Sequence, residues 1–91
     1  MLGSVKTIQL HPGPWVTGTR ANAYYGSISV IIRHKKSWTL SLNRAIHRLQ
    51  RKALRLGANS VVGVEIAIDP FSTPPTVTIV GTAAELVPLF S

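Results

Sequence analysis

The chain has 91 residues, of which 45% are hydrophobic and only 14% are charged, and its formal net charge at pH 7 is +7. It contains no cysteine, which excludes disulfides, thiolate metal sites and cysteine nucleophiles. The length fits a single domain over residues 1–91, with an extended arm at 1–14 and an apolar tail at 87–91. A small chain this apolar, with so few charges, indicates that copies of the chain cover part of its surface.

The charge balance and the apolar runs bear on partners and location. No run is long enough to cross a membrane, and residues 1–10 lack the basic start and apolar core of a secretion signal. We therefore expect a soluble, cytoplasmic protein. The positive charge has two interpretations, which are solubility and attraction to polyanions such as nucleic acid, anionic lipid or acidic protein. Composition alone favours the first.

The N-terminal third of the chain alternates between extended segments and turns. The prediction is a short strand or arm at 5–10, a proline-rich turn at 11–14, a short strand at 15–17 and a loop at 18–22. Residues 23–33 predict a longer strand, because aromatic and β-branched residues dominate it. Gly26 interrupts this strand and predicts a bulge or a close backbone approach.

A helix is predicted from Thr39 or Ser41 to Leu56, with Ser37, Thr39 or Ser41 as its N-cap. Its apolar residues recur at helical spacing and make one stripe, which comprises Leu42, Ala45, Ile46, Leu49, Ala53 and Leu56. A second stripe, opposite the first, comprises Arg44, Arg48, Arg51 and Arg55. No acidic residue lies in the helix, so no ion pair along it offsets the repulsion within this stripe.

The clearest local signal is the stretch from Leu56 to Asp69. Gly57 follows the last apolar residue of the helix, where a left-handed conformation suits glycine. The β-branched residues over 61–68 predict a strand, which the proline-rich segment 69–75 ends. A last strand over 76–86 completes an antiparallel hairpin. The tail at 87–91 is expected to dock on its own subunit or on a neighbour.

Together these elements indicate an α+β fold: a small, mostly antiparallel sheet of three or four strands with one long amphipathic helix, in the order β-(β)-α-β-β. One helix cannot cover both faces of such a sheet. The strand over 61–68 is apolar at successive positions, which is typical of burial on both faces. We therefore expect an interface between subunits that draws on Val61, Val62, Val64, Ile66, Ile68, Leu89 and Phe90.

Leu56-Gly57-Ala58-Asn59-Ser60-Val61-Val62-Gly63-Val64, with the later Val80-Gly81-Thr82-Ala83, resembles the YbjQ-like family, which carries a heavy-metal-binding label. Pro12-Gly13 and Tyr25-Gly26 are similar to its N-terminal portion. The resemblance implies an α+β domain that assembles into a ring, with a homopentamer as the implied state and a metal ion as the candidate cofactor. This chain departs from the family in the absence of acidic residues from its helix and in the short segment before that helix.

The residues themselves give little support to metal binding or catalysis. The weak metal candidates are His11, His34 and His47, and no two of them have the spacing at which one helix turn or strand supplies both imidazoles. A site would need one histidine from each of several subunits around a symmetry axis. The chain has no nucleophile elbow and no phosphate-binding loop. We expect no enzymatic activity.

Polyanion binding has more support, from basic residues in and just before the helix. The candidates are Arg44, Arg48, Arg51, Arg55, Lys52, Lys35 and Lys36. Arginine's planar fork matches phosphate, but the aromatic residues are not interleaved with the basic run, so base stacking is unsupported. The alternatives are a solvated helix face and a docking surface for an acidic protein or a neighbouring subunit. The leading hypothesis is a non-enzymatic, self-assembling interaction or scaffold domain, with nucleic-acid or polyanion binding and metal binding as alternatives.

Overall fold

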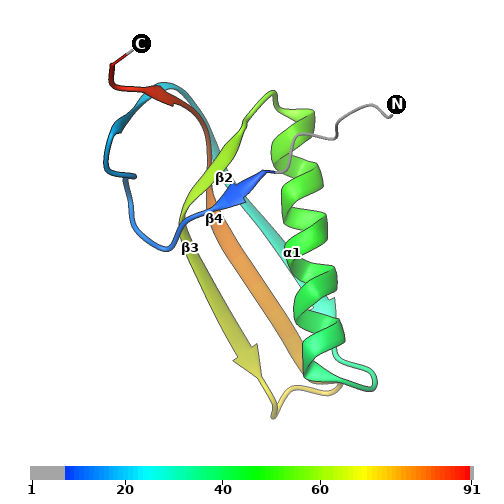
Figure 1. The fold of residues 1–91 in the computed structure, drawn as a ribbon. Coiled ribbons are helices and arrows are strands. Elements are labelled where there is room, and N and C mark those ends of the chain that lie inside the picture. The colour runs from blue at the N-terminus through cyan, green and yellow to red at the C-terminus, as the bar shows by residue number, and fades with distance from the viewer. Residues whose placement is uncertain (1–7, 91) are drawn as a thin grey trace.

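The computed structural model describes residues 8–90. In this part of the chain, a single helix packs on one face of a four-stranded sheet (Figure 1). Its elements are β1 (Gln9–Leu10), β2 (Thr19–Arg33), α1 (Trp38–Arg55), β3 (Ser60–Asp69) and β4 (Thr76–Pro88). The strands lie side by side in the order β1-β3-β4-β2; β1 is parallel to β3, and the other neighbours are antiparallel. The α+β class and the predicted order of elements are confirmed.

β2 and β4 are longer than predicted at the same end of the sheet. Thr19 pairs with Pro88, and Arg20 pairs with Val87, so positions 19–22 of the expected loop at 18–22 and positions 87–88 of the expected tail are strand. Both predictions were wrong for one reason: each segment is a weak strand former, and pairing between them makes both regular. Gly26 lies at a shift of register, with a φ of +104°, which confirms the predicted irregularity.

The segment before β2 is less regular than predicted. Residues 15–17 are not a strand, because two prolines precede them and Thr19 closes a turn on the carbonyl oxygen of Val16, to which its backbone N–H and its Oγ1 both donate. Of the strand expected at 5–10, Gln9 and Leu10 form β1, Ile8 is buried just before it, and positions 5–7 lie outside the described residues. The first half of the predicted N-terminal arm, positions 1–7 of 1–14, lies outside the described residues as well.

The ends of α1 follow from local chemistry. Ser37 is the N-cap, and its Oγ accepts from the backbone N–H of Leu40 at 3.4 Å. At the other end Gly57 has a φ of +88°, and its N–H donates to the carbonyl oxygen of Leu54 at 3.0 Å. The predicted glycine stop is confirmed, with the helix one residue shorter than expected at Arg55.

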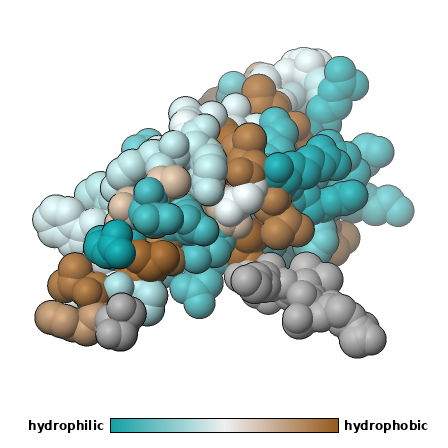
Figure 2. Space-filling view, turned by 90° about the horizontal axis from the view of Figure 1, so that it is seen from above, coloured by the Kyte–Doolittle hydropathy of each residue, from teal (hydrophilic) through white to brown (hydrophobic). Residues whose placement is uncertain are grey.

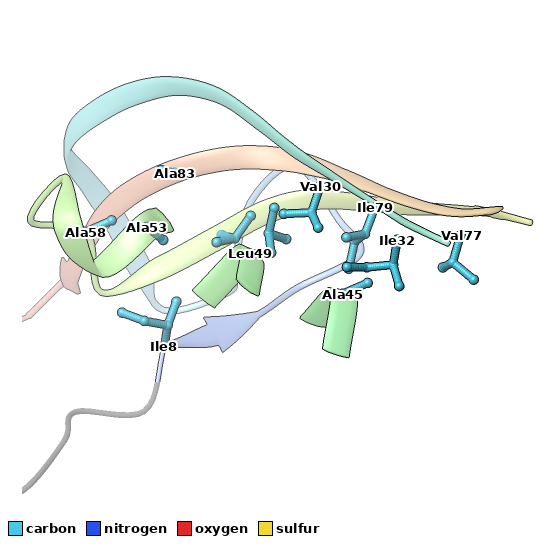
Figure 3. Close-up of a cluster of buried hydrophobic side chains, with 11 residues drawn as sticks. Ile8, Val30, Ile32, Ala45, Leu49, Ala53, Ala58, Val77, Ile79 and Ala83 are labelled. Carbon is cyan, nitrogen blue, oxygen red and sulfur yellow. The ribbon is translucent and has the colours of Figure 1, made fainter. Parts of the chain in front are cut away.

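The core lies between α1 and one face of β2, β3 and β4. Ala45, Leu49 and Ala53 of the predicted apolar stripe are fully buried. The strands contribute side chains that point toward the helix, as Figure 3 shows for Val30, Ile32, Val77 and Ile79. Leu56, the last member of that stripe, is instead 43% exposed because it follows the end of the helix.

The face of the sheet that points away from α1 carries the alternate residues of each strand. Cross-strand pairs share a face, so Ile31, Thr78 and Ala67 form one row there, and Ser29, Val80 and Glu65 form the next. In the described part of the chain, no helix covers this face, because α1 lies on the other one. The half of β3 from Glu65 to Asp69 is exposed on both faces.

Candidate functional site

A basic groove lies along α1. The groove has a volume of about 520 Å³ and runs from the connector before the helix to its middle turns. Its described lining comprises Lys35, Lys36, Ser37, Leu40, Ser41, Asn43, Arg44, His47, Arg48 and Arg51. We call this surface the α1 groove. Seen from above, hydrophilic residues gather on the right of the molecule, the side on which Figure 1 places α1 (Figure 2).

The α1 groove brings together five of the seven predicted polyanion-binding residues. Lys52 and Arg55 are not part of its described lining. The Nζ of Lys52 instead donates to the carbonyl oxygen of Ser29 in β2, at 2.7 Å, so this side chain is used within the fold. Arg55 lies in the last turn of the helix. The predicted stripe is therefore divided, and its N-terminal part gathers in one place.

The electrostatic character of the α1 groove is uniform. Its described lining holds five cationic side chains and no acidic one. The three acidic residues of the chain, Glu65, Asp69 and Glu85, all lie on strands. Such a concave surface of one sign favours an anion and raises its local concentration.

Sequence reasoning missed the polar and apolar residues between the cations. Ser37, Leu40 and Asn43 line the α1 groove, and Leu40 is 60% exposed there. Helical spacing could have predicted them, because each lies one helical turn from another residue of the groove. Leu40 lies outside the apolar stripe of the helix, so its position in the sequence predicted no site for it.

A second, smaller cavity of about 290 Å³ lies between α1 and the outer strand β2. Its described lining comprises Ile31, Ile32, Arg33, Lys35, Arg44 and Arg48. Arg44 and Arg48 thus lie between the α1 groove and this β2-side cavity, whereas Lys36 and Arg51 line the α1 groove alone. The distinction allows the two surfaces to be tested separately.

The three histidines lie in three different places. The ring of His34 stacks on that of Trp38, with centroids 3.6 Å apart, and its Nδ1 lies 3.1 Å from Oγ of Ser41. His47 lines the α1 groove, and His11 lines a cavity of mixed polar and apolar character near β1. Within residues 8–90, no three His, Asp, Glu or Cys side chains converge on one point. The described donors of one protomer therefore do not form a heavy-metal site.

The predicted interface residues divide into two groups. Val61 and Val62 are 0% and 4% exposed, so they pack inside the protomer and cannot line a surface between subunits. This corrects the prediction, and the reason is that α1 and neighbouring strands already enclose the first half of β3. Val64 is half-buried against the core. The exposed members are Ile66, Ile68, Leu89 and Phe90, and Ile31 of β2, which the prediction omitted, is 65% exposed.

Asn59 is a structural residue that its place in the sequence did not reveal. Its Nδ2 donates to the carbonyl oxygen of Leu86 at 2.8 Å, and its Oδ1 accepts from the backbone N–H of Leu86 at 2.9 Å. Its own backbone N–H donates to Ala84. The amide thus continues the ladder between β3 and β4 beyond the N-terminal end of β3, because it carries a donor and an acceptor on two separate atoms.

Comparison with known proteins identifies the family of the chain. The sequence profile of the YbjQ-like family, described as "Putative heavy-metal-binding", matches residues 31–87, which is more than half of the chain. The chain belongs to the YbjQ-like family. The match spans the last strand residues of β2, α1 and the β3–β4 hairpin, and it confirms the resemblance in the L-G-A-N and G-T-A segments. A search of curated proteins finds no match.

Among solved structures, the fold is similar to that of a DUF74-family protein of unknown function from Pediococcus pentosaceus. The TM-score is 0.57 at 10% sequence identity, and the alignment covers 87% of this chain and 95% of the other. At this identity the likeness concerns the fold alone. Within residues 8–90, no helix has the length and hydrophobicity that crossing a bilayer requires.

Proposed function

We propose that this protein is a non-enzymatic domain that assembles with copies of itself into a ring, as an interaction or scaffold module. The family resemblance makes five the proposed number of subunits. The observation that carries the proposal is a pair of open sheet edges at opposite sides of one protomer. Three features of these edges support it: their bare backbone, their apolar side chains and their opposite charges.

The first open edge belongs to β2, which is the outermost strand on its side. Among the described residues it pairs with β4 alone, so the other side of fifteen residues, Thr19–Arg33, has no described strand beside it. Lys52 occupies one carbonyl oxygen of this edge, at Ser29. A bare strand of this length is a template for another chain unless something covers it.

The second open edge belongs to the C-terminal half of β3. β1 pairs only with Ser60 and Val61, and backbone bonds from the segment 11–13 extend this cover to Val64. From Glu65 to Asp69, β3 has no described neighbour on that side. Ile66 and Ile68 are about half exposed there, on the face that carries α1, and Ile66 lines a small apolar cavity together with Ile46 of the helix.

The two edges differ in charge. Glu65 and Asp69, two of the three acidic residues of the chain, lie on the β3 edge. Arg33 ends β2, and Lys35 follows it in the β2-side cavity. Edges that are unlike in charge fit a head-to-tail contact, and a head-to-tail contact that closes gives a ring.

An exposed residue on β2 offers a test that spares the core. We expect Ile31→Lys to place a charge in the contact and to convert the assembly into monomers, because Ile31 is 65% exposed in the protomer and points away from α1. The measurement is the molar mass from light scattering behind a sizing column. Leu54→Lys is the matched control, since Leu54 lies on the helix, is 46% exposed and lines neither edge. Equal masses for the two variants and the natural chain would sink the proposal that this edge is the contact.

Metal binding, the description of the family, is the second candidate, and only a site shared between subunits is compatible with the separate positions of His11, His34 and His47. No described side-chain geometry favours it over assembly. We therefore treat metal content as a measured outcome rather than as the proposed function.

A further inference from the structure

We infer that the α1 groove binds nucleic acid through its phosphates, without reading the bases. The inference goes beyond self-assembly and does not depend on it, because every lining residue belongs to one protomer. It rests on the shape of the groove, on the spacing of its cations and on the residue types between them.

The spacing of the cations suits a chain of phosphates better than a single anion. From Ser37 to Arg51 the helix rises about 21 Å, at about 1.5 Å per residue. A DNA strand places one phosphate every 3.4 Å or so along the helix axis, so about six phosphates pass over this length. Arg44, Arg48 and Arg51 follow one another along the helix flank, and Lys35 and Lys36 extend the positive charge beyond its N-terminus.

The residue types favour contacts to the nucleic-acid backbone. Arginine presents a planar fork to phosphate oxygens, and Asn43 adds a neutral donor. The described lining contains no Phe, Tyr or Trp on which a base could stack. Contacts to phosphates position a strand but carry no sequence information, so binding should be independent of sequence.

The shape and charge of the groove argue against two other anionic partners. A lipid bilayer presents a broad surface, which does not follow a concave groove along a helix. An acidic protein presents scattered carboxylates, whereas the cations here recur along one line, as phosphates do. Binding to either partner in place of nucleic acid is therefore an outcome of the test.

The test uses two charge-matched variants of the full chain. Lys36→Gln with Arg51→Gln removes two cations from the α1 groove and none from the β2-side cavity. Arg20→Gln with Arg55→Gln removes the same net charge from outside the groove. Binding of a fluorescein-labelled single strand and of a labelled duplex is followed by anisotropy between about 50 and 200 mM NaCl. Co-sedimentation with phosphatidylserine vesicles and the anisotropy of a labelled polyglutamate chain, at the same salt concentrations, measure binding to the two other anionic partners. Thermal melting and sizing show whether each variant keeps its fold and assembly.

We expect the natural chain to bind both probes, with an affinity that falls steeply as salt rises. The groove variant should lose about 1.4 from the salt slope on the single strand and about 1.8 on the duplex, because two phosphate contacts are removed. The outer variant should keep the slope of the natural chain. Equal losses in the two variants, or no nucleic-acid binding at low salt, would overturn the inference. The same holds for binding to anionic vesicles or to an acidic protein alone.

Discussion

Gly81 of β4 lies against Val61 of β3 so closely that a Cβ on Gly81 would overlap the Cγ1 of Val61. The carbonyl oxygen of Val62 and the Cγ2 of Val64 would lie only 3.3 Å from the same Cβ. Val61 is fully buried and belongs to the core. Close packing thus explains the glycine of the G-T-A segment: it lets the core side chains of β3 lie directly over the backbone of β4.

Gly81→Ala should destabilise the protein because Val61 has no room to move away. We expect the free energy of unfolding to fall by about 1–3 kcal/mol, as for other overpacked cores. Chemical denaturation followed by circular dichroism measures this change. Gly13→Ala is the control, since an added Cβ there meets only an ordinary contact at 3.5 Å. A Gly81→Ala protein as stable as the control would contradict the packing.

Asn59→Ala should remove both side-chain hydrogen bonds to Leu86. We expect the free energy of unfolding to fall by about 1–2 kcal/mol. We also expect local opening where the N-terminal end of β3 lies beside the C-terminal end of β4. Asn43→Ala, on the exposed face of α1, should change it by less than about 0.5 kcal/mol. Hydrogen exchange at Leu86 adds a local measurement. Unchanged protection of that amide in Asn59→Ala would show that the bond is not formed in solution.

Metal removal should leave the fold intact. The described histidines and acidic residues do not converge, so we expect less than one metal ion per chain in protein purified without an affinity tag. Dialysis against a chelator should not change the melting temperature. Elemental analysis measures the metal content directly. A stoichiometric metal that disappears in His11→Ala, His34→Ala or His47→Ala would contradict this expectation, and one ion per ring would indicate a shared site.

Local signals predicted the helix and the hairpin well. Gly57 ends α1 because glycine adopts the left-handed backbone conformation readily, and this preference belongs to the residue itself. The strand preference of the β-branched residues in β3 is likewise a property of those residues. The apolar stripe was predictable because helical periodicity places Ala45, Leu49 and Ala53 on one face.

Pairing between distant segments was not predictable in the same way. Thr19 is in a strand because Pro88 pairs with it, and nothing in the sequence around either residue predicts that the two segments pair. The burial of Val61 and Val62 likewise depends on the strands and helix around them. The α1 groove was predictable in part. Helical periodicity places its arginines on one side of the helix, but only the structure shows that Lys35 and Lys36 of the connector line the same groove.

The mass of the native assembly tests the central claim most directly. Native mass spectrometry of the untagged chain at micromolar concentration should show a main species of five chains, each of 9.8 kDa, if the proposed ring joins the β2 edge of each copy to the β3 edge of the next. A spectrum dominated by single chains at that concentration would contradict the proposal that these edges join.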